Sequence, residues 1–268
     1  MGAVDEGENG GGSVVTIQAR LRTLDERVVG EAAEWRIRPQ IARALVIGPL
    51  VAALALAALL PFRVPFEWLT NEDSIIEWLQ VVALIVGGFM FARLALELLR
   101  MGRRYVGILF LAIAGMALFV AGEEISWGQR IFGWLTPTGL EAVNHQGEMN
   151  IHNIRPLQRA FNLAELAVGL YGVVVPVVLA AGLRARLTRA LDRFLFVPPL
   201  CLVSFFLLPF VYRLVRLVVL PEAGERITTY GELPELALYS GGMVFALLAV
   251  RVLSEARRRS AIENRVTT

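Results

Sequence analysis

The sequence contains no lysine, so all 26 basic side chains are arginines. Arginine without lysine is typical of the codon usage of a GC-rich bacterium, although arginine also suits the binding of phosphate and carboxylate groups. The single cysteine, Cys201, lies in an apolar run, so the chain has no internal disulfide and no thiolate metal site. A net charge of +2 and the lack of a basic cluster with interleaved aromatic residues give no indication of nucleic acid, and we expect no such partner.

Long apolar runs dominate the sequence, in which 56% of the 268 residues are hydrophobic. A bilayer is crossed by about 20 apolar residues in a helix. Six runs approach or exceed that length, at residues 41–60, 74–99, 105–128, 157–183, 194–220 and 233–253. We therefore predict an all-α, polytopic membrane protein, a bundle of about six transmembrane helices with an outward-facing polar cavity.

The ends of the chain differ in composition from this transmembrane domain, which we place at residues 41–256. Residues 1–13 are rich in glycine and predicted to be a disordered tail. Residues 14–40 show apolar positions near helical spacing, with charged residues between them, and predict an amphipathic helix. This helix lies either on the membrane surface or against the inner loops of the bundle. Residues 257–268 form a second tail.

The distribution of arginine predicts the orientation in the membrane, because arginine-rich connections stay on the cytoplasmic side. The N-terminal segment, the turn at Arg100 to Arg104, the turn at Arg184 to Arg193 and the C-terminal tail carry most of the arginines. We expect both termini on the cytoplasmic side of a bacterial inner membrane. The outer loop, residues 129–156, then faces outward.

Polar side chains gather near the outer ends of the predicted helices. A charge at the centre of a bilayer costs at least about 2.5–3.5 kcal/mol, so such groups are expected to face the bundle interior and pair there. Four carboxylates inside or beside apolar runs are predicted to do so, namely Glu77, Glu124, Glu165 and Glu235. The residues expected to bind a substrate are Asp73, Glu77, Trp127, Gln129, Arg130, Asn150, Arg213, Arg216 and Glu235.

The central stretch holds both histidines of the chain and reads GEEISWGQRIFGW at residues 122–134 and NHQGEMNIHN at 144–153. As a helix, it places His145, Glu148 and His152 on one face; as an extended strand, it aligns the polar residues at every second position from 144 to 152. Gly147 favours the extended form slightly. In that form Asn153 becomes the cap of the fourth transmembrane helix.

Carboxylate and imidazole side chains together can bind zinc, manganese or iron. The candidates for catalysis and for binding a metal are therefore the same three residues, Glu124, Glu148 and His152. The cofactor is left open, with a divalent metal as the candidate. The alternative is a hydrogen-bonded network that fixes the outer loop to the bundle.

Over residues 71–165, including EDSIIEW at 72–78, the chain resembles a group of multi-pass bacterial membrane proteins of uncharacterised activity that share the motifs GEEISWGQR and NxQGExNxHN. The resemblance implies a multi-pass membrane fold and no particular reaction. The chain is also loosely similar to ceramidase-like membrane hydrolases. Their zinc site uses several histidines, whereas this chain has only His145 and His152.

Three functions fit these features. The first is a metal-dependent or acid–base hydrolase or transferase embedded in the membrane, with a lipid or lipid-linked substrate and with Arg213 and Arg216 holding an anionic head group. The second is a carrier or channel for a cation or polar solute. The third is an accessory subunit of a membrane complex. The expected partner is membrane lipid, and a partner subunit or a second copy of the chain is left open.

The orientation is testable by labelling single-cysteine variants in intact cells. We expect a membrane-impermeant thiol reagent to reach a cysteine placed at Gly139 in the outer loop. A cysteine at Arg186 should react only after the membrane is permeabilised. Labelling at position 186 in intact cells would reverse the predicted orientation.

Overall fold

A computed structural model describes residues 9–71, 74–141, 144, 147–151, 154–181, 190–219 and 225–266. These residues form no strand. The α-helices are α1 (Asn9–Glu34), α2 (Pro39–Leu59), α3 (Arg63–Thr70), α4 (Ile75–Arg100), α5 (Arg104–Glu124), α6 (Gln129–Phe132), α7 (Thr138–Glu141), α8 (Arg155–Ala180), α9 (Ala190–Phe196), α10 (Val203–Val218), α11 (Glu225–Thr229) and α12 (Glu232–Val266). Short 3₁₀ turns, η1 (Ser126–Gly128) and η3 (Leu200–Leu202), precede α6 and α10.

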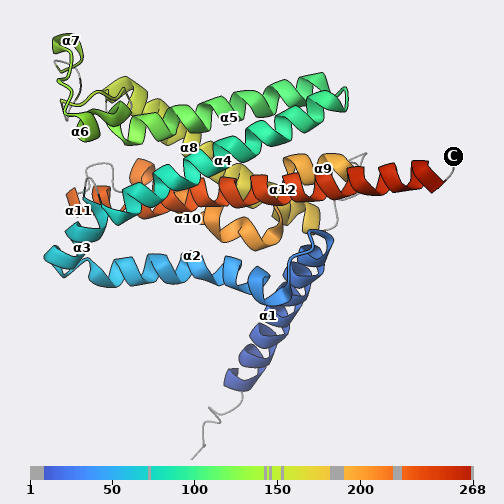
Figure 1. The fold of residues 1–268 in the computed structure, drawn as a ribbon. Helices are drawn as coiled ribbons and strands as arrows, with labels where there is room; N and C mark the ends of the chain where they lie inside the picture. Colours follow the sequence, from blue (N-terminus) through green and yellow to red (C-terminus); the bar gives the residue numbers. More distant parts are fainter. Residues whose placement is uncertain are drawn as a thin grey trace, which may run out of the picture.

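Within the described residues, six helical segments are long and apolar enough to cross a membrane. They are Pro39–Leu59, Arg63–Arg100, Arg104–Glu124, Pro156–Ala180, Asp192–Val218 and Ile227–Arg258. The predicted all-α polytopic bundle is thus confirmed, and the chain is an integral membrane protein. Its helices run roughly along one direction, with α1 crossing them at one end (Figure 1).

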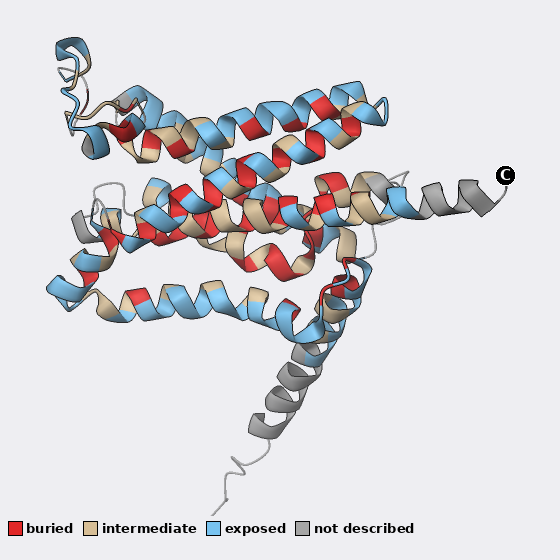
Figure 2. Cartoon of the chain, in the orientation of Figure 1, coloured by how far each residue is buried: buried red, intermediate tan, exposed pale blue. Residues whose placement is uncertain are grey.

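Helices α4, α12 and α10 occupy the middle of the bundle. Helix α4 packs against α5 and α12, and α10 packs against α8, α12 and α2. Half of the apolar segment that contains α4 is buried, compared with 17% for α2. Figure 2 accordingly shows buried residues concentrated along α4 and α12, while most of α2 is exposed. The exposed surfaces of α2 and α5 are apolar, which suits contact with lipid chains.

Two predicted spans differ from the helices in the structure. The third was expected to continue to residue 128, but α5 ends at Glu124 because Ser126, Trp127 and Gly128 all have positive φ angles. The fifth is broken between α9 and α10. Pro198 and Pro199 explain the break, because proline lacks a backbone N–H and disfavours helix at the residue before it.

The helix ends also differ slightly from expectation. Helix α1 spans Asn9–Glu34, whereas residues 14–40 were predicted, and α12 continues to Val266. The N-cap of α8 is Ile154 and makes no side-chain cap bond. Asn153, the predicted cap, lies outside the described residues, and Pro156 lies in the first turn of α8.

The C-terminal part of α1 is attached to the bundle by ion pairs. Glu31 is buried and accepts hydrogen bonds from the Arg193 guanidinium (2.5 Å) and the Leu200 amide (3.0 Å). Asp25 pairs with Arg43 at the start of α2 (2.7 Å), and the hydrogen bond from this arginine lowers the pKa of the Asp25 carboxyl. This helix was predicted to lie either on the membrane surface or against the bundle. Its C-terminal part packs against the bundle.

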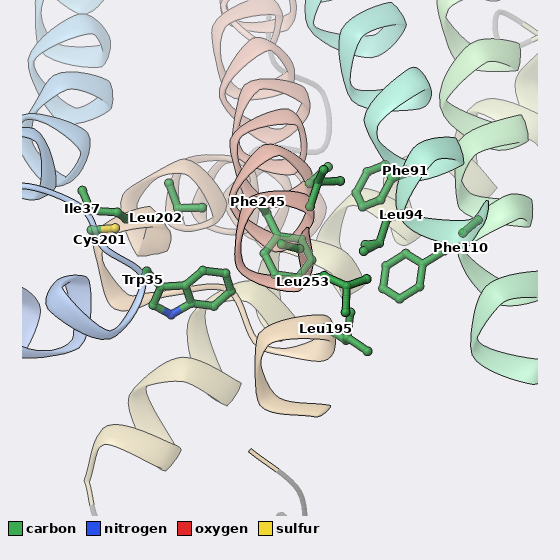
Figure 3. Packing of buried hydrophobic residues seen from close by; sticks show 14 of the residues in the cluster. Trp35, Ile37, Phe91, Leu94, Phe110, Leu195, Cys201, Leu202, Phe245 and Leu253 are labelled. Atoms are coloured by element: carbon green, nitrogen blue, oxygen red, sulfur yellow. The ribbon is translucent and has the colours of Figure 1, made fainter. Parts of the chain in front are cut away.

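The largest apolar core lies at the same end of the bundle. Trp35, with no exposed surface, meets the ring of Phe194 edge-on at 4.8 Å between centroids. Figure 3 shows Trp35 near Phe245 of α12 and places Cys201 among the apolar side chains of this core. Cys201 is buried and unbonded to another cysteine, as expected from its apolar run.

The arginine-rich connections that the structure describes lie at one end of the bundle, whereas residues 182–189, which hold most of the predicted turn at Arg184 to Arg193, lie outside the described residues. The turn from α1 to α2, the turn from α4 to α5 and the end of α12 are at this end, while α3, α6, α7 and α11 are at the other (Figure 1). This shared end is what the distribution of arginine predicted. Which end faces the cytoplasm stays a prediction.

Close packing of α8 on α10 depends on Gly172. A Cβ atom at this position would lie 2.2 Å from the Cγ atom of Phe206. Small residues allow transmembrane helices to approach closely. We expect Gly172→Ala to lower the free energy of unfolding by about 1–3 kcal/mol, a typical cost of overpacking.

The matched control is Gly115→Ala in α5, where a Cβ atom would meet nothing within 4 Å. Thermal unfolding of both purified variants in detergent provides the comparison. Equal midpoints for the two variants would show that the α8–α10 contact tolerates a side chain.

Candidate functional site

The segment that follows α5 has an unusual backbone. Ser126, Trp127 and Gly128 have φ angles of 44°, 54° and 79°, so three successive residues are left-handed. This conformation suits glycine but costs about 1–3 kcal/mol at other residues unless the surroundings hold it in place. This turn ends the transmembrane helix α5, and a set of hydrogen bonds fixes it.

The first of these bonds involve Glu123, whose surface is only 2% exposed. Its Oε1 atom accepts a hydrogen bond from Trp127 Nε1 (2.6 Å), and its Oε2 atom accepts one from the Ile151 amide (2.7 Å). Glu123 thus joins the end of α5 to the outer loop. It was not among the predicted site residues, although its i,i+4 spacing to Trp127 was a usable signal.

Near this turn, four polar side chains are joined to one another by hydrogen bonds. Ser126 Oγ, which is fully buried, donates to Glu148 Oε2 (2.6 Å). Asn150 Nδ2 donates to the same carboxylate oxygen (2.9 Å) and to Ser126 Oγ (3.1 Å). Asn144 Nδ2 in turn donates to the backbone oxygen and to Oδ1 of Asn150 (2.6 and 2.7 Å).

Gln129 closes the loop on its other side. Its Oε1 atom accepts from the Met149 amide (2.6 Å), and its Nε2 atom donates to Thr136 Oγ1 (2.6 Å). Thr136 donates onward to the backbone oxygen of Gly147 (2.6 Å), which has a φ angle of 66°. We call this set the loop network; it consists of Glu123, Ser126, Trp127, Gln129, Thr136, Asn144, Glu148 and Asn150.

The described residues of the central stretch form neither of the two predicted geometries. Residue 144 and residues 147–151 are not helical. They are not one extended strand either, because the Gly147 amide donates to the Asn144 backbone oxygen (3.3 Å) in a turn and Gly147 has a φ angle of 66°. Because hydrogen bonds engage these side chains within the loop, the predicted alternative of a network that fixes the loop describes them well.

A second polar set lies among the transmembrane helices. Arg213 of α10 donates from Nε to Glu165 Oε2 of α8 (2.6 Å) and from Nη2 to Glu235 of α12. The exposed fractions of these side chains are 12% for Arg213, 14% for Glu165 and 19% for Glu235. Removing one partner from such a buried group leaves an uncompensated charge and typically costs about 3–5 kcal/mol.

Two further contacts bring α5 and α4 to this set. Tyr239 of α12 donates from its hydroxyl to Glu124 Oε1 of α5 (3.2 Å). Gln80 Nε2 of α4 donates to the backbone oxygen of Glu232 (2.7 Å) and to its Oε2 atom (3.1 Å). We call the whole set the bundle cluster; it consists of Gln80, Glu124, Glu165, Arg213, Glu232, Glu235 and Tyr239.

The predicted site residues are therefore divided between two sets. Glu124, Arg213 and Glu235 lie in the bundle cluster, and Trp127, Gln129, Glu148 and Asn150 lie in the loop network. Glu77 lies in the first turn of α4, where its amide donates to Ser74 Oγ (3.4 Å), and Arg216 lies in the last turn of α10. Asp73 and His152 fall outside the described residues, as does the side chain of Arg130.

The predicted metal triad is incomplete in the described part of the chain because His152 lies outside it. Among the described residues, no group of three or more histidine, cysteine, aspartate or glutamate side chains is arranged to hold a metal ion. The metal site thus stays a prediction. It would depend on His152 together with the carboxylates.

The apolar spans and the paired charges between them define an integral membrane protein with two polar sets near one end of its bundle. No protein-family model, curated protein or solved structure matches the chain. The resemblance to a group of bacterial membrane proteins stays a prediction, as does the loose similarity to ceramidase-like hydrolases.

The role of Glu123 in holding the outer loop can be tested by substitution. Replacing Glu123 by alanine removes the charged acceptor of two partly buried donors, which should cost about 1–3 kcal/mol. We expect faster hydrogen exchange at residues 147–151, measured by mass spectrometry. Glu123→Gln keeps one good acceptor oxygen and should lie between the wild type and the alanine variant.

The matched control is Glu141→Ala, since Glu141 is exposed at the end of α7. Its exchange at residues 147–151 should equal that of the wild type. If Glu123→Ala also leaves this exchange unchanged, Glu123 does not hold the loop.

Proposed function

We propose that this integral membrane protein is an enzyme that acts on a lipid or lipid-linked substrate at the bundle cluster. The observation that carries the proposal is the Glu165–Arg213–Glu235 group, which joins three helices inside apolar segments. Ionisable residues in transmembrane helices are costly, and they commonly mark functional sites.

The hydrogen-bonded pair of Tyr239 and Glu124 supports acid–base chemistry at this cluster. A carboxylate and a phenol can accept and donate protons when a substrate lies between or beside them. Glu124 is only partly buried, so it is accessible to a bound substrate. Glu148 is a weaker candidate for catalysis because Ser126 and Asn150 both donate hydrogen bonds to it.

The lipid-exposed helices around the cluster support a substrate that arrives through the membrane. Leu163 and Val168 of α8 flank Glu165 in sequence and are 54% and 48% exposed. An apolar substrate tail could lie along this surface while its polar group enters the cluster. The pairing of Arg213 with two carboxylates already offsets its charge, so the proposal assigns no anionic head group to it.

A carrier for a cation or polar solute is the second candidate. It is favoured by the carboxylates that the bundle cluster places between the apolar helices, namely Glu124, Glu165, Glu232 and Glu235. Solute flux into proteoliposomes would support this candidate. Turnover of a lipid without flux would support the enzyme.

The enzyme proposal is tested by measuring the turnover of lipids by the purified protein in vesicles made from a total bacterial lipid extract. Mass spectrometry would identify species that are consumed and formed. We expect Glu124→Gln to lower turnover by about 10²- to 10⁴-fold, the usual contribution of a general acid or base.

The matched control is Glu67→Gln on α3, where Glu67 pairs with the exposed Arg63. It should retain wild-type turnover, and both variants should unfold at similar temperatures. If the Glu124→Gln variant retains full turnover, Glu124 is not the acid or base. If no lipid species changes, the enzyme proposal is wrong.

A further inference from the structure

The outer loop carries four exposed apolar side chains just after α6. Ile131, Phe132, Trp134 and Leu135 are 57%, 66%, 49% and 91% exposed. The rings of Phe132 and Trp134 stack with their centroids 5.0 Å apart. We call these four residues the loop patch. Exposed apolar side chains gathered in this way commonly mark a surface that contacts lipid or another protein.

The loop patch is part of a hydrogen-bonded turn. Gln129 Nε2 donates to Thr136 Oγ1 (2.6 Å), so one bond joins the residues on either side of the patch. The backbone oxygen of Gln129 accepts from the amides of Gly133 (2.8 Å) and Trp134 (3.2 Å). Gly133 has a φ angle of 67°, which lets the chain turn between Phe132 and Trp134. The apolar side chains are therefore presented by a folded turn.

The loop patch lies close to the level at which α5 ends. This helix is one of the apolar spans, and its last residue is Glu124. Between Glu124 and Ile131 the chain forms η1 and the first residues of α6. Such turns advance only about 1.5–2.0 Å per residue, so they cannot carry the patch far from the membrane. Figure 1 shows α6 at the end of α5 and α7 to the side of α5.

The apolar surface of α5 continues toward the loop patch. Met116, in the middle of this helix, is 58% exposed. Nearer its end, the ring of Phe119 meets Trp127 edge-on at 5.5 Å between centroids. Phe132 lies against Gly128, because a Cβ atom at Gly128 would be 3.0 Å from the ring. An apolar surface thus runs from α5 through the left-handed turn to the patch.

The tryptophans indicate the same level. Trp68, Trp78, Trp127 and Trp134 are exposed, and they belong to α3, the start of α4, η1 and the loop patch. These elements lie at one end of the bundle (Figure 1). Tryptophan is enriched at membrane–water interfaces because its ring is apolar but carries one N–H donor. This end of the bundle therefore has the aromatic side chains of an interface.

We infer that the loop patch inserts into the lipid interface, between the head groups and the chains, beside the end of α5. Lipid is the occupant because the patch continues the apolar surface of α5 and lies at the level of the exposed tryptophans. Amphipathic segments at this depth bury their apolar side by about 5–10 Å. The contact would hold the outer loop against the membrane. The inference goes beyond the proposed function and does not depend on enzyme activity.

The experiment measures the depth of a fluorescent label on the full-length protein in lipid vesicles. The buried Cys201 is first replaced by alanine, and Leu135→Cys then receives a nitrobenzoxadiazole dye. We expect lipids brominated in the upper part of the chain to quench this dye, and iodide on both sides of the membrane to quench it weakly. Met116→Cys on α5 is the depth reference and should be quenched best by lipids brominated further down the chain.

The matched control is Glu141→Cys, since Glu141 is charged and exposed in the same loop. Its dye should be quenched by iodide and hardly by brominated lipid. Phe132→Cys is labelled in the same way, so that the test stays decisive if Leu135→Cys does not fold. Strong quenching of the patch labels by iodide, without quenching by brominated lipid, would overturn the inference.

A protein partner would give a different result. If a second copy or another protein covers the loop patch, the dye at position 135 emits at short wavelength, and neither iodide nor brominated lipid quenches it. That outcome would also overturn the inference. Quenching by brominated lipid at positions 132 and 135, shallower than at position 116, would support the lipid contact whether or not the protein turns over any lipid.

Discussion

The ion-pair group at Arg213 is the interaction on which the arrangement of the bundle depends. Its guanidinium binds Glu165 of α8 and Glu235 of α12, so that it ties three helices together inside apolar segments. Because α12 also carries Glu232 and Tyr239, fixing α12 places these residues against α4 and α5. One buried cation therefore organises polar contacts among five helices. Without it, two carboxylates would have to become protonated or move toward water.

In the outer loop, hydrogen bonds offset the strain of the left-handed backbone that follows α5. Three left-handed residues end α5 and turn the chain, and Glu123 holds this turn through Trp127 and the Ile151 amide. Ser126 and Glu148 add a second attachment between the turn and the loop. The loop is thereby fixed at the end of α5, the helix that also contributes Glu124 to the bundle cluster.

The sequence by itself determined the class of protein and the number of spans. Runs of about 20 apolar residues leave few alternatives to transmembrane helix, because a bilayer cannot satisfy other backbone hydrogen bonds. The sequence also located the polar region, since charged side chains near the ends of apolar runs are conspicuous. It predicted Glu124, Arg213 and Glu235 as site residues for this reason.

Only the tertiary structure decided which of these groups meet. Gln80 and Glu232 are 152 residues apart in the chain, and no periodicity links them. Glu123 and Glu124 are adjacent and alike in sequence, yet one holds the outer loop and the other contacts Tyr239 of α12. The physical reason is that helical periodicity fixes the face on which a residue lies. Which neighbouring helix covers that face is settled by the packing of the whole bundle.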